Sequence, residues 1–255
     1  MGIIKIVWVC SWAALATAVL FLPMTIAAFL GSTGNAAFNV SKVWAHVMLI
    51  VTGVRTEIRG REKIEAGRSY IIISNHQSLF DIPALVTRLG IQFRWVIKKE
   101  LLKVPLFGYA LWASKNIFID RSDRGQAVES IREGLKRLPP GVSVMVFAEG
   151  TRSPDGAIRP FKKGGFVIAI DNGLPILPVT VNGSRRVLPK GSMAYSSGSI
   201  EVVVGDPIDT GDQGREGLEI VMQRTRDAII ANFNPGYPSG EGGVESGSRG
   251  CGSQP

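Results

Sequence analysis

The chain has 255 residues, 45% of them hydrophobic, so it can bury a substantial core. It carries 29 lysines and arginines against 21 aspartates and glutamates, and the resulting net charge of +8 suits an anionic partner such as a phospholipid surface or a phosphorylated substrate. No nucleic-acid-binding motif accompanies this charge, and the two cysteines, Cys10 and Cys251, lack metal-ligating neighbours, so we expect no nucleic-acid partner, no metal and no disulfide.

An apolar run without any charge fills residues 6–30. These 25 residues would form about 37 Å of helix, which exceeds the thickness of a bilayer's hydrocarbon core. A signal peptide is the alternative, but its apolar region is usually only about 7 to 15 residues long. Pro23 should kink or break the helix. The run therefore predicts a membrane anchor.

A second apolar stretch, residues 43–54, follows an uncharged loop expected at residues 31–39. Twelve residues are too few to cross a bilayer, which favours a re-entrant or interfacial helix. Lys5 is the only charge before the first apolar run, whereas several basic residues follow the second. These are Arg55, Arg59, Arg61 and Lys63. The positive-inside rule then places the rest of the chain on the cytoplasmic side, with residues 1–54 as its membrane element.

From residue 55 onward, strand-like and helix-like segments alternate. Strands are expected near residues 55–59, 70–74, 93–97, 116–119, 142–147, 176–181 and 200–204. Helices are expected near residues 82–89, 105–113, 125–138, 164–171 and 215–233. This alternation predicts an α/β fold with a mainly parallel or mixed sheet flanked by helices. Residues 55–233 should form that domain, and the residues 234–255, rich in Gly, Ser and Pro, a disordered tail.

The stretch Ser74-Asn75-His76-Gln77-Ser78-Leu79-Phe80-Asp81 joins an expected strand to an expected helix. A histidine at the end of a buried strand is presented into a crevice, where His76 can accept a proton from an alcohol. Asp81, the nearest carboxylate in sequence, would orient the imidazole if the chain folds back on itself. The other histidine, His46, lies in an apolar segment, which narrows the choice of base to His76.

A structural interpretation of the same stretch stays open. Ser78-x-x-Asp81 matches a helix capping box, in which Asp81 would bind backbone N–H groups and have no catalytic task. Pro83, a residue favoured at the first helical position, indicates instead a helix that begins later.

Three more polar stretches follow strands or precede a helix. Arg121 ends the strand of residues 116–119 and could grip a phosphate, or could form a solvated neighbour pair with Asp120. Lys162, in the basic stretch 161–165 before a helix, suits an anion site at a helix N-terminus, although lysines there are commonly solvated.

The third stretch is Phe147-Ala148-Glu149-Gly150-Thr151-Arg152-Ser153. Glu149, Thr151 and Arg152 could orient the hydroxyl and the phosphate of one substrate. A turn held by Gly150 and residues 153–156 would explain the same residues without any substrate.

In order and spacing these stretches resemble the motifs of the 1-acyl-glycerol-3-phosphate acyltransferase family. The motif Asn-His-x4-Asp is matched by Asn75, His76 and Asp81. The motif Gly-x-x-Phe-x-x-Arg is matched by Phe118 and Arg121, with Lys115 where glycine is usual.

The third and fourth family motifs follow in order. Phe-Pro-Glu-Gly-Thr-Arg-Ser is matched by residues 147–153 with Ala148 in place of proline, and the proline-containing strand by residues 177–183. The resemblance covers about residues 55–210. An N-terminal two-helix membrane element is also what the resemblance implies.

The resemblance implies transfer of an acyl group from acyl-coenzyme A or acyl carrier protein to the sn-2 hydroxyl of lysophosphatidic acid, without a resident cofactor. His76 would be the general base, and Asp81 would hold its imidazole. Arg121 and Arg152 would bind the phosphate, and Glu149 and Thr151 the glycerol. The complete expected site has His76 and Asp81 as catalytic residues and Arg121, Glu149, Gly150, Thr151, Arg152, Lys162 and Pro178 as substrate-binding residues.

Two alternatives are kept. The acceptor could be another lysolipid, such as a lyso-ornithine lipid or a lysophospholipid with a head group, or the protein could be a non-catalytic module that binds anionic lipids. Lipid binding alone needs neither His76 nor Asp81. We expect a bacterial inner-membrane protein with its large domain on the cytoplasmic side.

Overall fold

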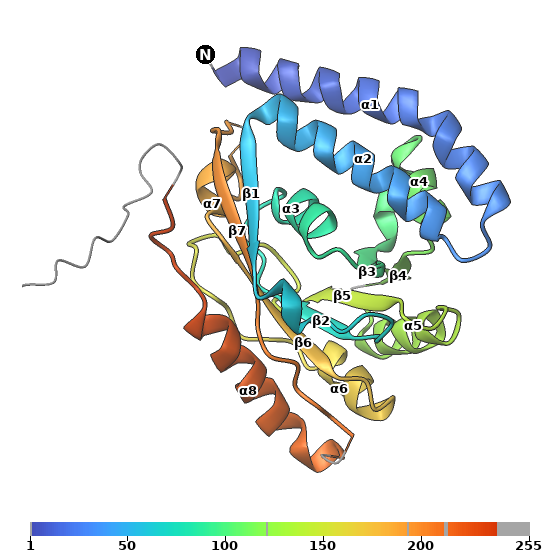
Figure 1. Ribbon diagram of the computed structural model, residues 1–255, viewed down its shortest axis with the longest axis vertical. Helices are drawn as coiled ribbons and strands as arrows, with labels where there is room; N and C mark the ends of the chain where they lie inside the picture. The colour runs from blue at the N-terminus through green and yellow to red at the C-terminus, as the bar shows by residue number, and fades with distance from the viewer. Residues whose placement is uncertain (1, 121, 193, 212–213, 239–255) are drawn as a thin grey trace, which may run out of the picture.

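The computed structural model describes residues 2–120, 122–192, 194–211 and 214–238, and within them the expected α/β fold is confirmed (Figure 1). Seven strands form one mixed sheet in the order β1-β7-β6-β2-β5-β3-β4. Every neighbouring pair is parallel except β6 and β7. The strands are β1 (Val54–Arg59), β2 (Ile71–Ser74), β3 (Phe93–Lys98), β4 (Ile117–Ile119), β5 (Ser143–Phe147), β6 (Ile176–Asn182) and β7 (Gly198–Val204).

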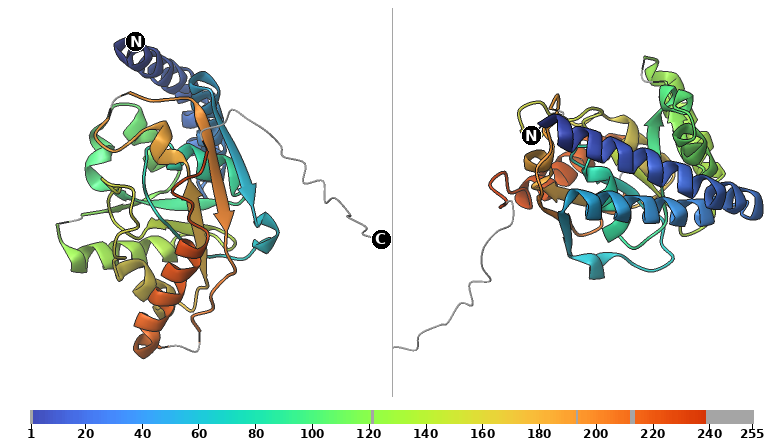
Figure 2. Two further views of the ribbon diagram at one scale, coloured as in Figure 1. Left: turned by 90° about the vertical axis from the view of Figure 1, so that its left-hand side faces the viewer. Right: turned by 90° about the horizontal axis from the view of Figure 1, so that it is seen from above.

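Helices cover both faces of the sheet, as a largely parallel sheet requires (Figures 1 and 2). Beyond the N-terminal pair, the α-helices are α3 (Asp81–Arg88), α4 (Phe107–Ala113), α5 (Arg124–Lys136), α6 (Gly164–Asp171), α7 (Ser184–Val187) and α8 (Leu218–Ala231). Short 3₁₀ turns are η1 (Arg61–Lys63), η2 (Lys99–Lys103) and η3 (Arg215–Gly217). Strand β2 is buried along its whole length, because it lies at the centre of the sheet between β5 and β6.

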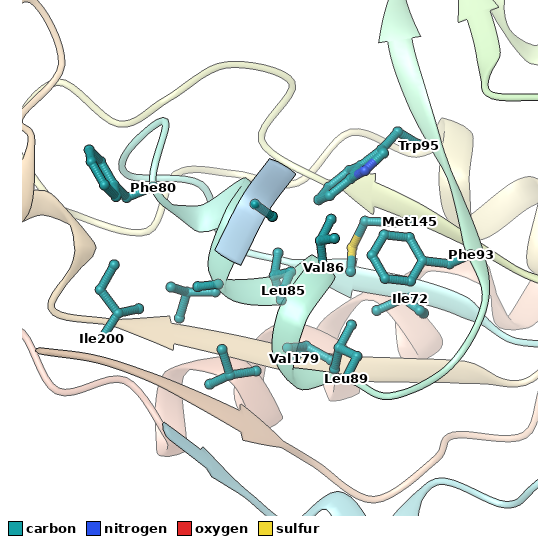
Figure 3. Packing of buried hydrophobic residues seen from close by; sticks show 14 of the residues in the cluster. Ile72, Phe80, Leu85, Val86, Leu89, Phe93, Trp95, Met145, Val179 and Ile200 are labelled. Carbon is teal, nitrogen blue, oxygen red and sulfur yellow. The ribbon is translucent and has the colours of Figure 1, made fainter. Parts of the chain in front are cut away.

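The side chains of β2 alternate between two hydrophobic clusters. Ile72 belongs to the cluster beneath α2 and α3, whereas Ile71 and Ile73 belong to the cluster beneath α5, α6 and α8. Figure 3 shows the first cluster, in which the residues of α3 pack against those of the strands. The labelled members include Ile72, Leu85, Val86, Leu89, Phe93, Trp95, Met145 and Val179. Two well-packed faces hold the carboxyl ends of β2, β5 and β6 rigidly side by side.

Helices α1 (Gly2–Leu30) and α2 (Asn35–Thr52) precede the sheet and lie against one another. The break expected at Pro23 and the length expected for the second helix are wrong, whereas a kink at Pro23 stays a prediction. Helix α1 continues through Pro23, and α2 begins at Asn35 within the expected loop, so it has 18 residues where twelve were expected. The loop shortens because Gly34 turns the chain at a φ of 78° and Phe38, inside the expected loop, is buried against Phe93.

Helix α1 is the one helix of the described residues that is long and apolar enough to cross a membrane. The most apolar 18-residue window of this helix has a mean hydropathy of 2.2, and large apolar side chains such as Val19 and Leu22 remain exposed. Hydrogen bonds from Trp8 Nε1 to the Val51 carbonyl and from Trp44 Nε1 to Thr17 Oγ1 fasten α1 to α2. An exposed apolar surface of this size indicates membrane association.

The last expected helix and the expected tail also differ in detail. Helix α8 begins at Leu218, after the 3₁₀ turn η3. The chain after α8 stays folded: the Tyr237 amide donates to the Asn234 carbonyl, and the Tyr237 hydroxyl hydrogen-bonds Glu57 of β1. Of the tail expected at 234–255, residues 239–255 lie outside the described residues.

Arg94 of β3 holds the turn between α1 and α2 against the sheet. It is fully buried, and its guanidinium donates to the Thr33 carbonyl at 3.0 Å, to Asn35 Oδ1 at 2.5 Å and to the Phe93 carbonyl at 2.9 Å. Burial lowers the pKa of Arg94 to about 10. A cation stays in this position because carbonyl and amide oxygens from two separate segments converge on it.

We expect Arg94→Ala to lower the free energy of unfolding by about 3 kcal/mol or more, because several buried acceptors would lose their donor. Urea unfolding measures the loss, and proteolysis in the segment 31–34 should accelerate. Arg132→Ala is the control: Arg132 forms surface ion pairs on α5, whose loss costs at most about 1 kcal/mol. Equal losses in the two variants would contradict this role of Arg94.

Candidate active site

The site is built where β2 ends at the carboxyl edge of the sheet. Asn75, the first residue after β2, is fully buried, and its side chain bonds to neighbouring strand β6. Its Nδ2 donates to the Val181 carbonyl at 3.0 Å, and its Oδ1 accepts from the Val181 amide at 2.8 Å. One amide side chain thus replaces a pair of ladder hydrogen bonds. Asn75 thereby fixes the position at which the chain leaves the sheet and presents His76.

His76 and Asp81 are in direct contact, with His76 Nδ1 2.7 Å from Asp81 Oδ2. The same Oδ2 accepts the backbone amides of Gln77, at 2.7 Å, and Ser78, at 2.9 Å. One carboxylate oxygen therefore accepts backbone amides, as a cap does, and also contacts the histidine. Helix α3 begins at Asp81, so the later start indicated by Pro83 is wrong. Among the described residues His76 Nε2 has no partner, which leaves that nitrogen for a substrate.

Aromatic rings fix the plane of the imidazole. Phe147, the last residue of β5, stacks on His76 with ring centroids 3.8 Å apart and planes 8° from parallel. Trp95 of β3 lies against the other end of Phe147 at 5.4 Å. The hydrogen bond to Asp81 and the stacking on Phe147 leave the ring little freedom. Sequence reasoning did not single out Trp95, whose only signal was its position in a strand, and it named Phe147 as the first residue of the motif at 147–153 without giving it a role.

Glu149 lies behind the histidine. Its Oε1 accepts the His76 backbone amide at 2.9 Å and its Oε2 accepts the Arg159 amide at 3.2 Å. Burial raises the pKa of the Glu149 carboxyl above its usual value, and the two amide hydrogen bonds partly offset this. Both oxygens are thus engaged with the backbone, so Glu149 fixes the position of the His76 backbone, and its expected contact with the glycerol of a substrate stays a prediction.

Comparison with known proteins agrees with this geometry. Residues 55–182 match the family model described as Acyltransferase. The chain is 36% identical over 176 residues to the 1-acyl-sn-glycerol-3-phosphate acyltransferase of Pseudomonas aeruginosa, covering 69% of this chain and 67% of that one. It is 31% identical over 192 residues to the alpha form from Homo sapiens, covering 75% and 68%. The chain belongs to the 1-acyl-sn-glycerol-3-phosphate acyltransferase family.

Two further relatives show how far the likeness extends. The chloroplastic 1-acyl-sn-glycerol-3-phosphate acyltransferase BAT2 of Brassica napus is 33% identical over 171 residues, but the match spans about half of that protein, 49%, and 66% of this chain. The crystal structure of the 1-acyl-sn-glycerophosphate acyltransferase PlsC from Thermotoga maritima superposes with a TM-score of 0.74 at 26% identity. That match covers 91% of this chain and 97% of the crystallised one.

In this acyltransferase the loop after β5 brings most of the other expected residues together. Gly150 turns the chain at a φ of 73°, and a Cβ there would lie 2.7 Å from Lys162 Cε. The Lys162 amide in turn donates to the Ala148 carbonyl at 2.8 Å. Gly150 and Lys162, 12 residues apart in sequence, are therefore neighbours beside the histidine loop. The substrate contacts expected of these residues stay predictions.

Thr151 is exposed and Arg152 half-buried in the same loop. Lys190, which sequence reasoning did not single out, donates to the Arg152 carbonyl at 2.8 Å and lies 3.4 Å from Thr151 Oγ1. Three cationic side chains, Arg152, Lys162 and Lys190, thus come from this loop or touch it. The phosphate-binding role of Arg152 stays a prediction.

Pro178 and Arg121 remain to be placed relative to this loop. Pro178 is buried in the middle of β6, in register with Ile73 of β2, and its expected substrate contact stays a prediction. Its carbonyl accepts the Gly205 amide at 2.8 Å, beyond the end of the antiparallel ladder. Arg121 lies outside the described residues.

The backbone conformation of Lys115 explains why glycine is usual at this motif position in the family. It has a φ of 56°, in the left-handed region that glycine adopts without steric cost. We expect Lys115→Gly to be more stable than Lys115→Ala by about 1 kcal/mol, since both lose the contact of Lys115 with the Trp112 ring and only alanine keeps the strained Cβ. Chemical denaturation of both variants measures the difference. Equal stability would show that glycine serves another purpose here.

We expect Glu149→Ala to lower both the melting temperature and kcat while leaving KM for the acceptor nearly unchanged. The substitution removes the acceptors of two backbone amides, each worth about 1 to 3 kcal/mol when buried, and frees the backbone of His76. Steady-state kinetics below the melting temperature provide the measurement. A selective rise in KM for the acceptor would instead support the substrate-binding role expected from the sequence.

Proposed function

We propose that this acyltransferase moves an acyl group from a thioester donor, acyl-coenzyme A or acyl carrier protein, to the sn-2 hydroxyl of lysophosphatidic acid and so forms phosphatidic acid. The observation that carries the proposal is the contact between His76 and Asp81, which leaves Nε2 open at the carboxyl edge of the sheet. The names of the Pseudomonas aeruginosa and Homo sapiens relatives support the choice of acceptor.

The proposed mechanism uses the substrate hydroxyl as the nucleophile. His76 Nε2 takes the hydroxyl proton while the oxygen attacks the thioester carbonyl and forms the new C–O bond. Asp81 stabilises the imidazolium through Nδ1. When the tetrahedral intermediate collapses, the C–S bond breaks and the proton on Nε2 passes to the departing thiolate. A thiolate is a good leaving group, so this chemistry needs no resident cofactor.

A narrow apolar cavity lies on the side of the sheet that α1 and α2 cover. Its wall includes Trp95, which reaches the histidine through Phe147. Other wall residues come from the helices, among them Thr17, Phe21, Trp44, Phe107 and Leu111. Apolar walls beside an exposed apolar helix suit the hydrocarbon chain of a lipid substrate. This cavity supports a lipid acceptor that enters from the membrane.

The phosphate of the acceptor would contact Arg152, with Arg121 and Lys162 completing the binding site. Arginine can hold a phosphate through two parallel hydrogen bonds, which favours a phosphate monoester over a neutral head group. The protein would sit on the cytoplasmic side of a bacterial inner membrane, with residues 1–54 as the membrane element and residues 55–233 as the catalytic domain. The basic residues that follow α2 support that orientation.

Transfer of a radiolabelled acyl group by the detergent-solubilised protein tests the proposal. Acyl-coenzyme A and acyl carrier protein serve as alternative donors, and lysophosphatidic acid competes with lysophosphatidylcholine and a lyso-ornithine lipid at equal concentration. We expect labelled phosphatidic acid as the main product. Preference for another acceptor would replace lysophosphatidic acid in the proposal, and no transfer with any pair would favour the lipid-binding alternative.

A further inference from the structure

A second cavity, of about 560 Å³, opens at the same edge of the sheet. Gln77, which directly follows His76, lines it together with segments that follow β5, β6 and α8. Its other principal wall residues are Asp155, Gly156, Arg185, Arg186 and Phe233. Figure 1 shows α8 on the opposite side of the sheet from α1 and α2. This cavity shares no wall residue with the apolar cavity beside α1, so it meets the histidine loop at a separate place.

The two arginines in the wall of this cavity are not paired with acidic side chains among the described residues. Arg185 Nη1 is buried and has no hydrogen-bond partner among the described residues. Neither Arg185 nor Arg186 forms an ion pair in the part of the chain that the structure describes. Asp155 is the acidic residue of the wall, but its Oδ1 accepts from Ser153 Oγ at 2.9 Å and from the Ala157 amide at 3.1 Å. An unsatisfied guanidinium group beside an open cavity is suited to an anion.

The position of Arg185 is fixed by its surroundings. Its guanidinium packs on Gly156, where a Cβ would lie 2.8 Å from Nη1. Gly156 has a φ of 92°, and its carbonyl accepts Gln77 Nε2 at 2.8 Å. The backbone of the loop after β5 therefore connects the arginine to the residue next to the base. An anion held by Arg185 would be linked to the reacting atoms through a rigid wall.

Building on the function proposed above, we propose that this cavity binds the phosphate of the phosphopantetheine arm of the acyl donor. Acyl-coenzyme A and acyl carrier protein share that arm, which joins a phosphate to the thioester through an extended polar chain. The cavity is open and partly polar, whereas the cavity beside α1 is apolar and suits the lipid acceptor. A water-soluble donor would therefore approach His76 through a cavity separate from the apolar one beside α1.

Kinetics with two donors test this assignment. Acyl-coenzyme A carries the phosphate, and acyl-pantetheine lacks it. We expect Arg186→Ala and Arg185→Gln each to raise KM for acyl-coenzyme A by about tenfold or more, because each removes a charged hydrogen bond to the phosphate. KM for acyl-pantetheine and for lysophosphatidic acid should change by less than about twofold. Arg224→Ala, which removes an exposed positive charge from α8, is the matched control and should leave all three constants unchanged.

Calorimetric titration of coenzyme A into the wild-type protein and the Arg186→Ala variant gives a readout that does not depend on activity. Binding to the wild type that weakens by about tenfold in the variant would support the assignment. A rise in KM for lysophosphatidic acid alone would overturn it, since the cavity would then hold the acceptor phosphate. Unchanged coenzyme A binding in both arginine variants would also overturn it. Wild-type protein that binds coenzyme A but acylates no lysolipid would refute the proposed function while leaving the anion site standing.

Discussion

Replacing His76 by alanine should lower kcat by about 10² to 10⁴, the range typical for loss of a general base. The imidazole is the group whose free nitrogen faces the open edge of the sheet, and Asp81 and Phe147 hold it in one orientation. Without it the sn-2 hydroxyl would attack the thioester as a neutral alcohol. Acyl transfer by the purified variant, measured over a long incubation, provides the test.

The control for this experiment is His46→Ala. His46 is exposed on α2, and its Nδ1 bonds the Lys42 carbonyl four residues earlier. We expect its replacement to leave turnover unchanged, because it lies away from the carboxyl edge of the sheet. Binding of lysophosphatidic acid to His76→Ala should remain close to that of the wild type. Activity that survives in His76→Ala would remove this residue from the mechanism.

The central strands of the domain could be predicted closely, because β2, β5 and β6 are short, mainly apolar runs with polar residues or glycine close to their ends. Strand β6, expected at 176–181, ends one residue later at Asn182, and β5, expected at 142–147, begins one residue later at Ser143. A buried central strand leaves a continuous apolar signal that depends little on its neighbours. The contact between His76 and Asp81 could also be predicted from the sequence, since both residues lie in one turn.

The remaining features depend on contacts between distant segments. Asn39 and the residues before it look like a loop in sequence, yet Phe38 is buried against Phe93 and Arg94 bonds Asn35, so α2 extends to that point. The two backbone donors of Glu149 could not be located from the sequence, since one of them lies 73 residues away at His76. No local pattern encodes such a partner, which is why its role could not be predicted.

Replacing Asp81 by asparagine should lower kcat by about 10² or more and also reduce stability. Asp81 Oδ2 accepts three hydrogen bonds, two of them from backbone amides, and a neutral oxygen accepts them more weakly. Asp81 Oδ1 is buried without a partner among the described residues, so an amide nitrogen placed there would be an unsatisfied donor. We expect a loss of about 1 to 3 kcal/mol in the free energy of unfolding.

Kinetics and unfolding must be measured together, because Asp81 both caps the loop and contacts the base. Rates are compared well below the melting temperature, where wild type and variant are both folded. Asp123→Asn is the matched control: Asp123 caps α5 by accepting the Gln126 amide, and asparagine caps a helix equally well, so activity and stability should be retained. The kcat of Asp81→Asn is corrected for the fraction of folded protein. If the corrected kcat equals the wild-type value, Asp81 serves only as a capping residue. A large loss in a fully folded variant would instead show that Asp81 acts on the base itself, through its charge beside the developing imidazolium or through its hold on the Nδ1–H tautomer.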